Sequence, residues 1–254
     1  MKRIALIALA AAAALVSCSR NQGLKTAVYE KSAIVALAEG ATDSISIDVK
    51  LEYPVSGLSK EAMDAISRSI LGQTLEYTGE SPDFEAAVSR YIDATVADYK
   101  DTNLELWQES QENGEHYMGL TWGDELVGTF SEPHRNIVSY VLYSYSFQGG
   151  AHGNWGDYVT NFNMEDGSIV SEEDLFIPEY KEELSRLLTD HLYESMPDED
   201  AYDGLFVKEI EPNGNFEVSE AGISYLYNPY EIGPYAIGLI TVTVPWQELE
   251  HILK

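Results

Sequence analysis

The chain has 254 residues, with 15 Lys and Arg against 43 Asp and Glu, which gives a formal net charge of −28. A field of this sign repels nucleic acid and anionic lipid headgroups, and it speeds encounter with cationic partners. Solubility alone is the other explanation for the charge. The single cysteine excludes an internal disulfide, so stability must come from the burial of apolar surface.

A targeting segment is predicted at the start of the chain. Lys2 and Arg3 precede an apolar run, Ile4 to Val16, that is too short to span a bilayer as a mature helix. The tetrapeptide Leu15-Val16-Ser17-Cys18, which overlaps the end of this run, is similar to the bacterial lipobox. In the lipobox the cysteine becomes the lipidated first residue of the mature protein. We therefore expect residues 1–17 to be a lipoprotein signal peptide and Cys18 to be lipidated. An ordinary cleaved signal peptide with an incidental cysteine is the alternative.

After a tether at residues 18–26, the clearest strand covers Ile45 to Val55, where apolar and polar residues alternate with a period of two. Pro54 suits the end of this strand or a sheet edge. A helix capped by Ser59 follows and is expected to stop at Gly72. A second helix is predicted with Ser81 as N-cap and Pro82 at its first position, and its apolar stripe continues to Tyr99.

The rest of the chain reads mainly as strands. The run from Ile137 to Phe147 has apolar or aromatic side chains on both faces, which places it in the middle of a sheet. Tyr158 to Met164 alternates again and ends at a hairpin-type turn, and an apolar stripe predicts a helix from Tyr180 to Leu192. Other strands are expected at residues 104–107, 117–122, 206–210, 216–218, 223–227 and 237–244, with a closing helix at residues 246–253.

Clustered strands with inserted helices, and few connections suited to parallel crossovers, indicate the α+β class. We expect antiparallel sheets with helices packed on them, in two similar-sized, intimately packed halves. Residues 131–136 are the best boundary, which gives an N-terminal α+β partner domain at 27–130 and a C-terminal α+β domain at 131–254.

The stretch from Phe147 to Trp155 is the loop that the chemistry of the sequence singles out. Three glycines in five residues allow positive φ and close backbone approach. Such a loop either forms a structural turn or presents its backbone to a ligand. His152 is hydrogen-bonded to the loop backbone or acts as a ligand or base. The candidate contact residues of this loop are Gly149, Gly150, His152, Asn154 and Trp155.

The tyrosine-rich segment from Tyr225 to Tyr235 is the second candidate. Tyrosine buries a large apolar body in cores, and it is also frequent at interfaces. Both readings remain open, and Glu231 is the residue that most needs a partner if it is buried. The candidate contact residues of this segment are Tyr230, Glu231 and Tyr235.

Four ordered motifs in the second half carry a resemblance to a known family. They are Tyr145-Ser146-Phe147-Gln148-Gly149-Gly150-Ala151-His152, Thr160-Asn161-Phe162-Asn163 with Gly167, Glu173-Asp174-Leu175-Phe176, and Tyr227 to Gly238 before Val244-Pro245. This half resembles the C-terminal extracellular domain of lysozyme-sensing anti-sigma factors and related lipoproteins of unknown function. Residues 27–129 are similar to the partner domain that precedes it, which some polysaccharide deacetylases also carry.

The resemblance implies an extracytoplasmic fold that binds a protein or a glycan. Those anti-sigma factors have a sigma-binding segment and a transmembrane helix ahead of these domains, whereas this chain has the lipobox there. We expect no deacetylase domain after the region of resemblance. We therefore expect a lipid-anchored envelope protein, in the outer membrane and facing the periplasm, whose partner is a cationic protein such as a lysozyme, or cell-wall glycan.

Catalytic motifs are missing from the sequence. It has no Gly-x-Ser-x-Gly elbow, zinc helix, P-loop or dinucleotide fingerprint, and its five histidines lack metal-ligand spacing. No catalytic residue, metal or cofactor is therefore predicted, and the protein is expected not to be an enzyme. The alternatives are a hydrolase or deacetylase that uses His152 with Asp157, and an envelope scaffold without a small ligand.

Overall fold

The computed structural model describes residues 17–18, 23–115 and 117–254, with only the backbone of the first pair. Residues 1–16 of the predicted signal peptide and residues 19–22 of the predicted tether therefore lie outside the described residues, and the last two tether residues, Lys25 and Thr26, belong to a strand instead. The fold is a mixed α+β architecture with mainly antiparallel sheets and packed helices, as expected. Within the described residues, no helix has the length and apolar character needed to cross a membrane.

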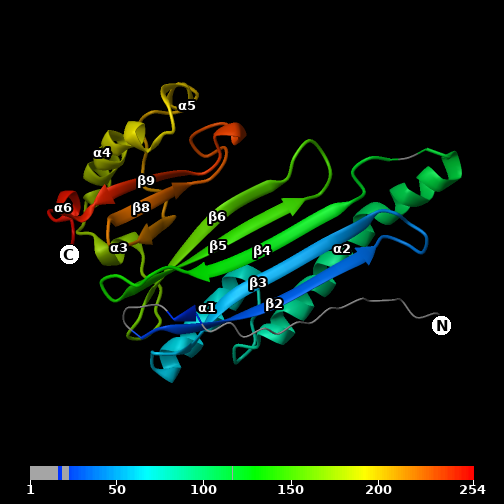
Figure 1. Cartoon of the computed structure of the whole chain (residues 1–254), viewed down its shortest axis with the longest axis horizontal. Helices are drawn as coiled ribbons and strands as arrows, with labels where there is room; N and C mark the ends of the chain where they lie inside the picture. The colour runs from blue at the N-terminus through cyan, green and yellow to red at the C-terminus, as the bar shows by residue number, and fades with distance from the viewer. Residues whose placement is uncertain (1–16, 19–22, 116) are drawn as a thin grey trace.

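A six-stranded sheet forms the larger part of the molecule (Figure 1). Its strands lie side by side in the order β1 to β6: β1 (Ser17–Cys18), β2 (Lys25–Ala36), β3 (Ser44–Ser56), β4 (Trp122–Phe130), β5 (Ile137–Phe147) and β6 (Asn154–Asn163). All neighbours are antiparallel except β3 and β4. This parallel pair is an exception to the antiparallel expectation, because two helices cross over between its strands.

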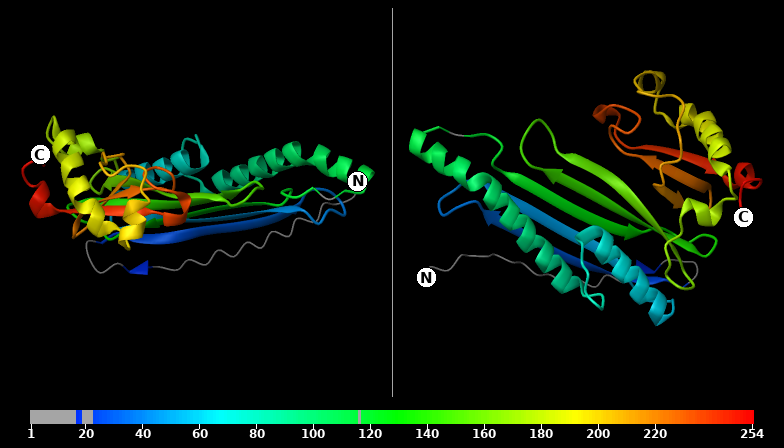
Figure 2. Two further views of the ribbon diagram at one scale, coloured as in Figure 1. Left: turned by 90° about the horizontal axis from the view of Figure 1, so that it is seen from above. Right: turned by 180° about the vertical axis from the view of Figure 1, so that it is seen from behind.

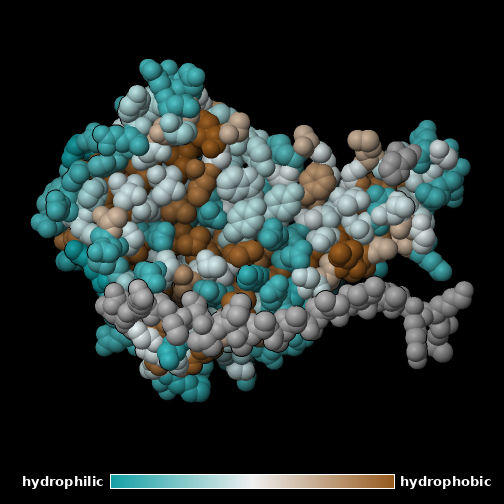
Figure 3. Space-filling model, viewed as in Figure 1, coloured by the Kyte–Doolittle hydropathy of each residue, from teal (hydrophilic) through white to brown (hydrophobic). Residues whose placement is uncertain are grey.

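These two helices, α1 (Lys60–Leu75) and α2 (Phe84–Asn113), cover one face of the sheet (Figures 1 and 2). The alternation in β3 determines which face they cover, because Ile45, Ile47, Val49 and Leu51 are all buried against them. The opposite face, which we call the open face, carries the polar residues of β3. Figure 3 shows this face, where apolar surface is interspersed with polar groups.

The predicted start of α1 is confirmed, and its predicted end is wrong. The Ser59 hydroxyl accepts a hydrogen bond from the Ala62 amide, which is the expected cap. The helix passes Gly72 and ends at Leu75, because Leu71 and Leu75 are spaced one turn apart and both are buried in the core.

The second helix begins later and ends much later than predicted. Asp83, instead of Ser81, is the N-cap, since its carboxylate accepts from the Ala86 amide at 2.9 Å. The helix continues to Asn113, which overturns the strand predicted at residues 104–107. Tyr99, Asn103 and Ser110 fall on one buried helical face, and this burial keeps the segment helical.

Other strand boundaries also differ from the predictions. The strand predicted at 117–122 begins only at Trp122, where pairing with Ile45 starts. Residues 206–210 form no strand, and Phe206 and Val207 are exposed. The strand predicted at 237–244 is β9 (Ile240–Pro245), which begins where pairing with β8 begins. The helix predicted at 246–253 is shorter, because α6 covers only Trp246–Leu249.

The C-terminal part packs a three-stranded antiparallel sheet against helices. The sheet contains β7 (Phe216–Val218), β8 (Gly222–Tyr227) and β9, and the predicted helix α4 (Tyr180–Leu192) packs on it. Two short helices, α3 (Glu172–Leu175) and α5 (Glu199–Asp203), were not predicted. The six-stranded sheet continues across the predicted boundary at residues 131–136, which form the connection between β4 and β5.

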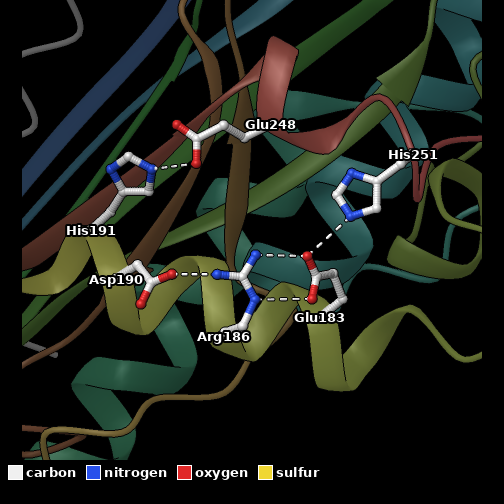
Figure 4. Close-up of polar contacts among 6 residues, drawn as sticks. All are labelled: Glu183, Arg186, Asp190, His191, Glu248 and His251. Carbon is white, nitrogen blue, oxygen red and sulfur yellow. Dashed lines mark hydrogen bonds and ion pairs between the residues drawn. The ribbon is translucent and has the colours of Figure 1, made fainter.

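A polar cluster joins α4 to the end of the chain (Figure 4). Arg186 donates to Glu183 at 2.7 and 3.0 Å and to Asp190 at 2.5 Å. The imidazole of His251 lies 3.0 Å from Glu183, and that of His191 lies 3.1 Å from Glu248. These contacts attach α6 and the residues after it to the exposed side of α4.

Candidate functional site

The glycine loop connects β5 to β6 at one end of the large sheet. Gly149 and Gly150 have φ values of +85° and +105°, which L side chains rarely adopt. A Cβ on Gly149 would lie 2.7 Å from the Gly119 carbonyl oxygen, and one on Gly153 would lie 2.3 Å from the Tyr145 ring. These glycines therefore allow the loop to turn tightly and to approach the connection between α2 and β4.

His152 extends from this loop toward the tyrosine-rich segment. Its Nδ1 lies 2.9 Å from the Gly153 carbonyl oxygen, which accepts only, so Nδ1 carries the proton in the neutral ring. Its Nε2 is then the acceptor for the Tyr230 hydroxyl at 3.3 Å. The imidazole also stacks on Tyr235, with ring centroids 4.0 Å apart, and the Tyr235 hydroxyl donates to the Gly153 carbonyl at 3.0 Å.

The turn that carries Tyr230 is constrained by its backbone. Tyr230 has a φ of +74°, an uncommon conformation for a bulky residue, and its side chain is 54% exposed. Its amide donates to the Gly233 carbonyl, and the neighbouring Glu231 amide donates to Asn228. The Glu231 carboxylate accepts from the Asn213 side chain at 2.8 Å. This turn therefore holds an exposed aromatic ring beside His152.

Two cross-strand rows on the open face continue this cluster. Strand register places Glu125, Tyr145 and Trp155 side by side across β4, β5 and β6. The next row places Tyr143 opposite Asp157, and the Tyr143 and Trp155 rings lie 6.2 Å apart. We call these five residues the open-face patch. Glu125 is exposed and the other four are half-buried.

Two ionisable groups of the open-face patch have shifted pKa values. Burial, followed by the charges of Glu125 and Asp157, raises the pKa of Tyr143 above its ordinary value. Burial also raises the pKa of the Asp157 carboxyl. Aromatic rings and carboxylates therefore share one partly desolvated surface, where they can contact a cation together.

Asparagine side chains from the C-terminal part hold β6 in place. The Asn228 side chain accepts from the Asp157 amide at 2.8 Å and donates to its carbonyl at 3.1 Å. Asn215 accepts from the Val159 amide at 2.8 Å and also donates to the Asp157 carbonyl. These bonds occupy the outer edge of β6, which would otherwise present unpaired backbone groups.

The structure brings together only some of the predicted site residues. His152, Tyr230 and Tyr235 form one stack, and Trp155 lies in the adjoining patch. Gly149 and Gly150 determine the shape of the loop tip, Asn154 is exposed at the start of β6, and Glu231 bonds to Asn213. Within the tyrosine-rich segment, Tyr225 and Tyr227 are core residues. Both readings of that segment therefore apply, to different residues.

Sequence reasoning missed Glu125, Tyr143 and Tyr145. The alternation within residues 137–147 places the two tyrosines on one face, which is a signal that the sequence did contain. The strand that carries Glu125 was predicted to end at Trp122, so its place opposite Tyr145 could not be inferred.

The geometry around His152 gives no support to the hydrolase alternative. General base catalysis would need a carboxylate within hydrogen-bond reach of the imidazole. In the described part of the chain, the contacts of the ring nitrogens are the Gly153 carbonyl and the Tyr230 hydroxyl, and no carboxylate bonds to them. No group of three or more metal-ligating side chains suited to a metal ion occurs among the described residues either.

Comparisons with known proteins show a partial match to one family model and a shared fold with two solved structures. Residues 173–247 match the model of a protein family of unknown function, DUF3298. Two solved structures share the fold over most of the chain. A DUF3298 family member from Bacteroides fragilis NCTC 9343 is 23% identical, with a TM-score of 0.82, over 92% of this chain and 96% of that one. A DUF3298 family protein from Pseudomonas aeruginosa PAO1 is 18% identical, with a TM-score of 0.64, over 91% of this chain and 94% of that one. A search of curated proteins gave no significant match.

Proposed function

We propose that this protein is a non-catalytic binding module of the bacterial cell envelope that captures a cationic protein such as a lysozyme. The open-face patch and the adjoining rings of His152, Tyr230 and Tyr235 are the proposed contact surface. The observation that carries the proposal is the row formed by Glu125, Tyr145 and Trp155, in which a carboxylate lies beside two aromatic rings.

The chemistry of this surface suits the side chains of lysine and arginine. A cationic side chain is attracted by the face of an aromatic ring and by a nearby carboxylate at the same time. The net charge of −28 adds long-range attraction for a basic protein and increases its rate of encounter. The resemblance of the second half to the extracellular domain of lysozyme-sensing anti-sigma factors points in the same direction.

Anchoring in the envelope belongs to the same proposal. The lipobox at residues 15–18 would attach the mature protein through Cys18 to the outer membrane, facing the periplasm. The residues after Cys18 lack an acidic run of the kind that some lipoproteins use for export to the surface, which favours the periplasmic side. A periplasmic module in this place would meet basic proteins that enter the envelope.

Titration with hen egg-white lysozyme at low and moderate salt tests the proposal. Glu125→Lys places a positive charge in the patch, so we expect affinity to fall by about tenfold or more. Glu105→Lys is the matched control, because Glu105 is exposed on α2 and the substitution changes net charge by the same amount. We expect that variant to bind nearly as well as the wild type.

Four outcomes would contradict the proposal. Absence of binding in both salt conditions removes the lysozyme version. Equal losses in the two variants, with binding abolished at moderate salt, mean that net charge alone is responsible. Binding of cell-wall glycan at this patch instead of lysozyme would replace the cationic partner with the glycan alternative, and no effect of any patch variant would favour a scaffold.

A further inference from the structure

Three adjoining hollows lie along the outer edge of β6, away from the open-face patch. The first, of about 460 Å³, lies between α1 and strands β4 to β6. The second, also about 460 Å³, shares Gln73 and Thr160 with the first. The third, of about 410 Å³, shares Tyr158 with the first and Asn213 and Gly214 with the second. We call this connected depression the β6 trough.

The first hollow opens on the side of the sheet that carries the helices, and the other two lie along the edge of β6. Side chains alternate along β6, so Tyr158 and Thr160 lie on the helix side whereas Trp155 and Asp157 lie on the open face. Seen from behind, α1 and α2 lie over the β2–β4 side, and β6 is visible between them and the C-terminal part (Figure 2). A ligand stacked on Tyr158 would therefore lie on the other face of β6 from Trp155 and Asp157.

The first hollow combines an apolar floor with polar walls. Leu126, Leu142 and Phe162 line its base, and Ser144 and Thr74 are among the polar residues around them. Volumes between about 300 and 1,000 Å³ are usual for small-molecule sites, and such sites place a few polar groups on a mainly apolar surface. The hollow thus has the size and the mixed lining of a ligand site.

Several polar groups in the trough have hydrogen-bonding capacity left over. The Gln73 carbonyl oxygen accepts from the Thr160 hydroxyl at 2.7 Å, and this leaves its amide nitrogen, with two donors. The hydroxyls of Thr74, Ser144 and Tyr158 form no hydrogen bond with another residue in the part of the chain that the structure describes. These uncharged donors and acceptors suit a ligand with many hydroxyl groups.

Tyr158 adds an aromatic surface where the first and third hollows meet. Its side chain is 54% exposed, although it lines both hollows. A pyranose ring presents C–H groups on its faces and hydroxyls around its rim, so it can stack on a tyrosine ring while amides and hydroxyls bond its rim. The exposed ring and the uncharged polar groups around it match this pattern.

Charge narrows the ligand further. The buried Glu172 in the second hollow already accepts from the Tyr180 hydroxyl at 2.7 Å and from the Gly214 amide at 3.0 Å. Glu231 in the third hollow is bonded to Asn213. Glu172 and Glu231 are thus engaged within the protein, and the other two charged residues of the trough, Glu173 and Lys181, carry opposite charges. The acidic chain as a whole repels anions. We therefore infer that the β6 trough binds a neutral oligosaccharide, with Tyr158 stacked on one sugar ring and Gln73 bonded to its hydroxyls.

Calorimetric titration of the purified protein with three neutral tetrasaccharides tests this inference. The probes are cellotetraose, maltotetraose and the β-1,4-linked tetramer of N-acetylglucosamine. We expect one of them to bind with one-to-one stoichiometry and a millimolar or lower Kd. Tyr158→Ala should weaken this binding by about tenfold, since stacking on an aromatic ring is lost. Gln73→Ala should weaken it as well.

Tyr193→Ala is the matched control, because Tyr193 is also 54% exposed but lies outside the trough. It should leave oligosaccharide binding unchanged, and far-UV circular dichroism should show that all variants are folded. Absence of binding for all three probes, or equal binding by wild type and Tyr158→Ala, would overturn the inference. Lysozyme titration of Tyr158→Ala keeps this result separate from the proposal for the open face.

Discussion

The side chain of Asn228 takes the place of a neighbouring strand for Asp157. Its carboxamide oxygen accepts from the Asp157 amide at 2.8 Å, and its nitrogen donates to the Asp157 carbonyl at 3.1 Å. Asn228 is 8% exposed, so both bonds are shielded from water. Gly156 makes this approach possible, because a Cβ there would lie 2.8 Å from the Asn228 carboxamide oxygen.

Replacing Asn228 by Ala should therefore destabilise the junction between the large sheet and the C-terminal part. The Asp157 amide loses its side-chain partner, whereas its carbonyl keeps the bond from Asn215, and a loss of about 1–3 kcal/mol in the free energy of unfolding is expected. Urea denaturation measures it. Asn154→Ala is the control, because Asn154 is exposed and its loss should cost less than about 0.5 kcal/mol. Equal effects of the two substitutions would contradict the structural role of Asn228.

The two glycines at the loop tip should respond differently to substitution by Ala. Both have positive φ, so each variant is strained by about 1–3 kcal/mol. Gly149→Ala also forces a Cβ to within 2.7 Å of the Gly119 carbonyl oxygen, whereas nothing lies within 4 Å of a Cβ at Gly150. In thermal unfolding, Gly149→Ala should have a lower melting temperature than Gly150→Ala. The opposite ranking would mean that the loop does not pack against Gly119.

The Glu183 cluster should make stability depend on pH in the acid range. Hydrogen bonding to Arg186, and then to His251, lowers the pKa of Glu183 from 4.5 to about 2. Because the folded-state pKa is depressed, the contribution of Glu183 to the free energy of unfolding is fully present above about pH 4.5 and is lost as pH falls toward 2. The wild type should exceed Glu183→Gln in melting temperature above pH 4.5, and the difference should vanish near pH 2.

Glu182→Gln is the control for this pH dependence. Glu182 is exposed on the same helix and forms no ion pair with a described residue. Its removal should leave the pH profile close to that of the wild type. Added salt should reduce the Glu183 effect, because the cluster is solvent-accessible and screened. A difference that persists unchanged at pH 2 would contradict the assignment.

The lipid anchor is tested by Cys18→Ala. Without the thiol, no diacylglyceryl group can be attached, so the variant should leave the membrane fraction for the soluble fraction. Cell fractionation with immunoblotting measures the distribution. Ser19→Ala is the control, since it leaves Leu15-Val16-Ser17-Cys18 intact. Retention of Cys18→Ala in the membrane fraction would show that the anchor is something other than a lipid on this residue.

Local patterns in the sequence determined several elements. Alternation over Ile45 to Val55 predicted β3, because one face of a half-buried strand must be apolar. Ser59 marked the start of α1, because a hydroxyl there satisfies an otherwise unpaired amide. The central position of residues 137–147 followed from apolar side chains on both faces, and β4 and β6 do flank β5.

Predictions failed where tertiary contacts override local preference. A short apolar run such as residues 104–107 is compatible with a strand or a helix. Here the segment is helical because Tyr99, Asn103 and Ser110 are buried on one helical face. Residues 206–210 contain strand-forming side chains but have no partner strand, so they remain a loop.

The sequence by itself determined the α+β class and placed a glycine loop with His152 and Trp155 between two strands, because these features depend on local spacing and backbone freedom. Only the tertiary structure decided which distant residues join them. Tyr235 reaches Gly153 across 82 residues of sequence, and Glu125 reaches Tyr145 only through strand register. Register and long-range packing depend on the whole buried surface, and no short stretch of sequence encodes them.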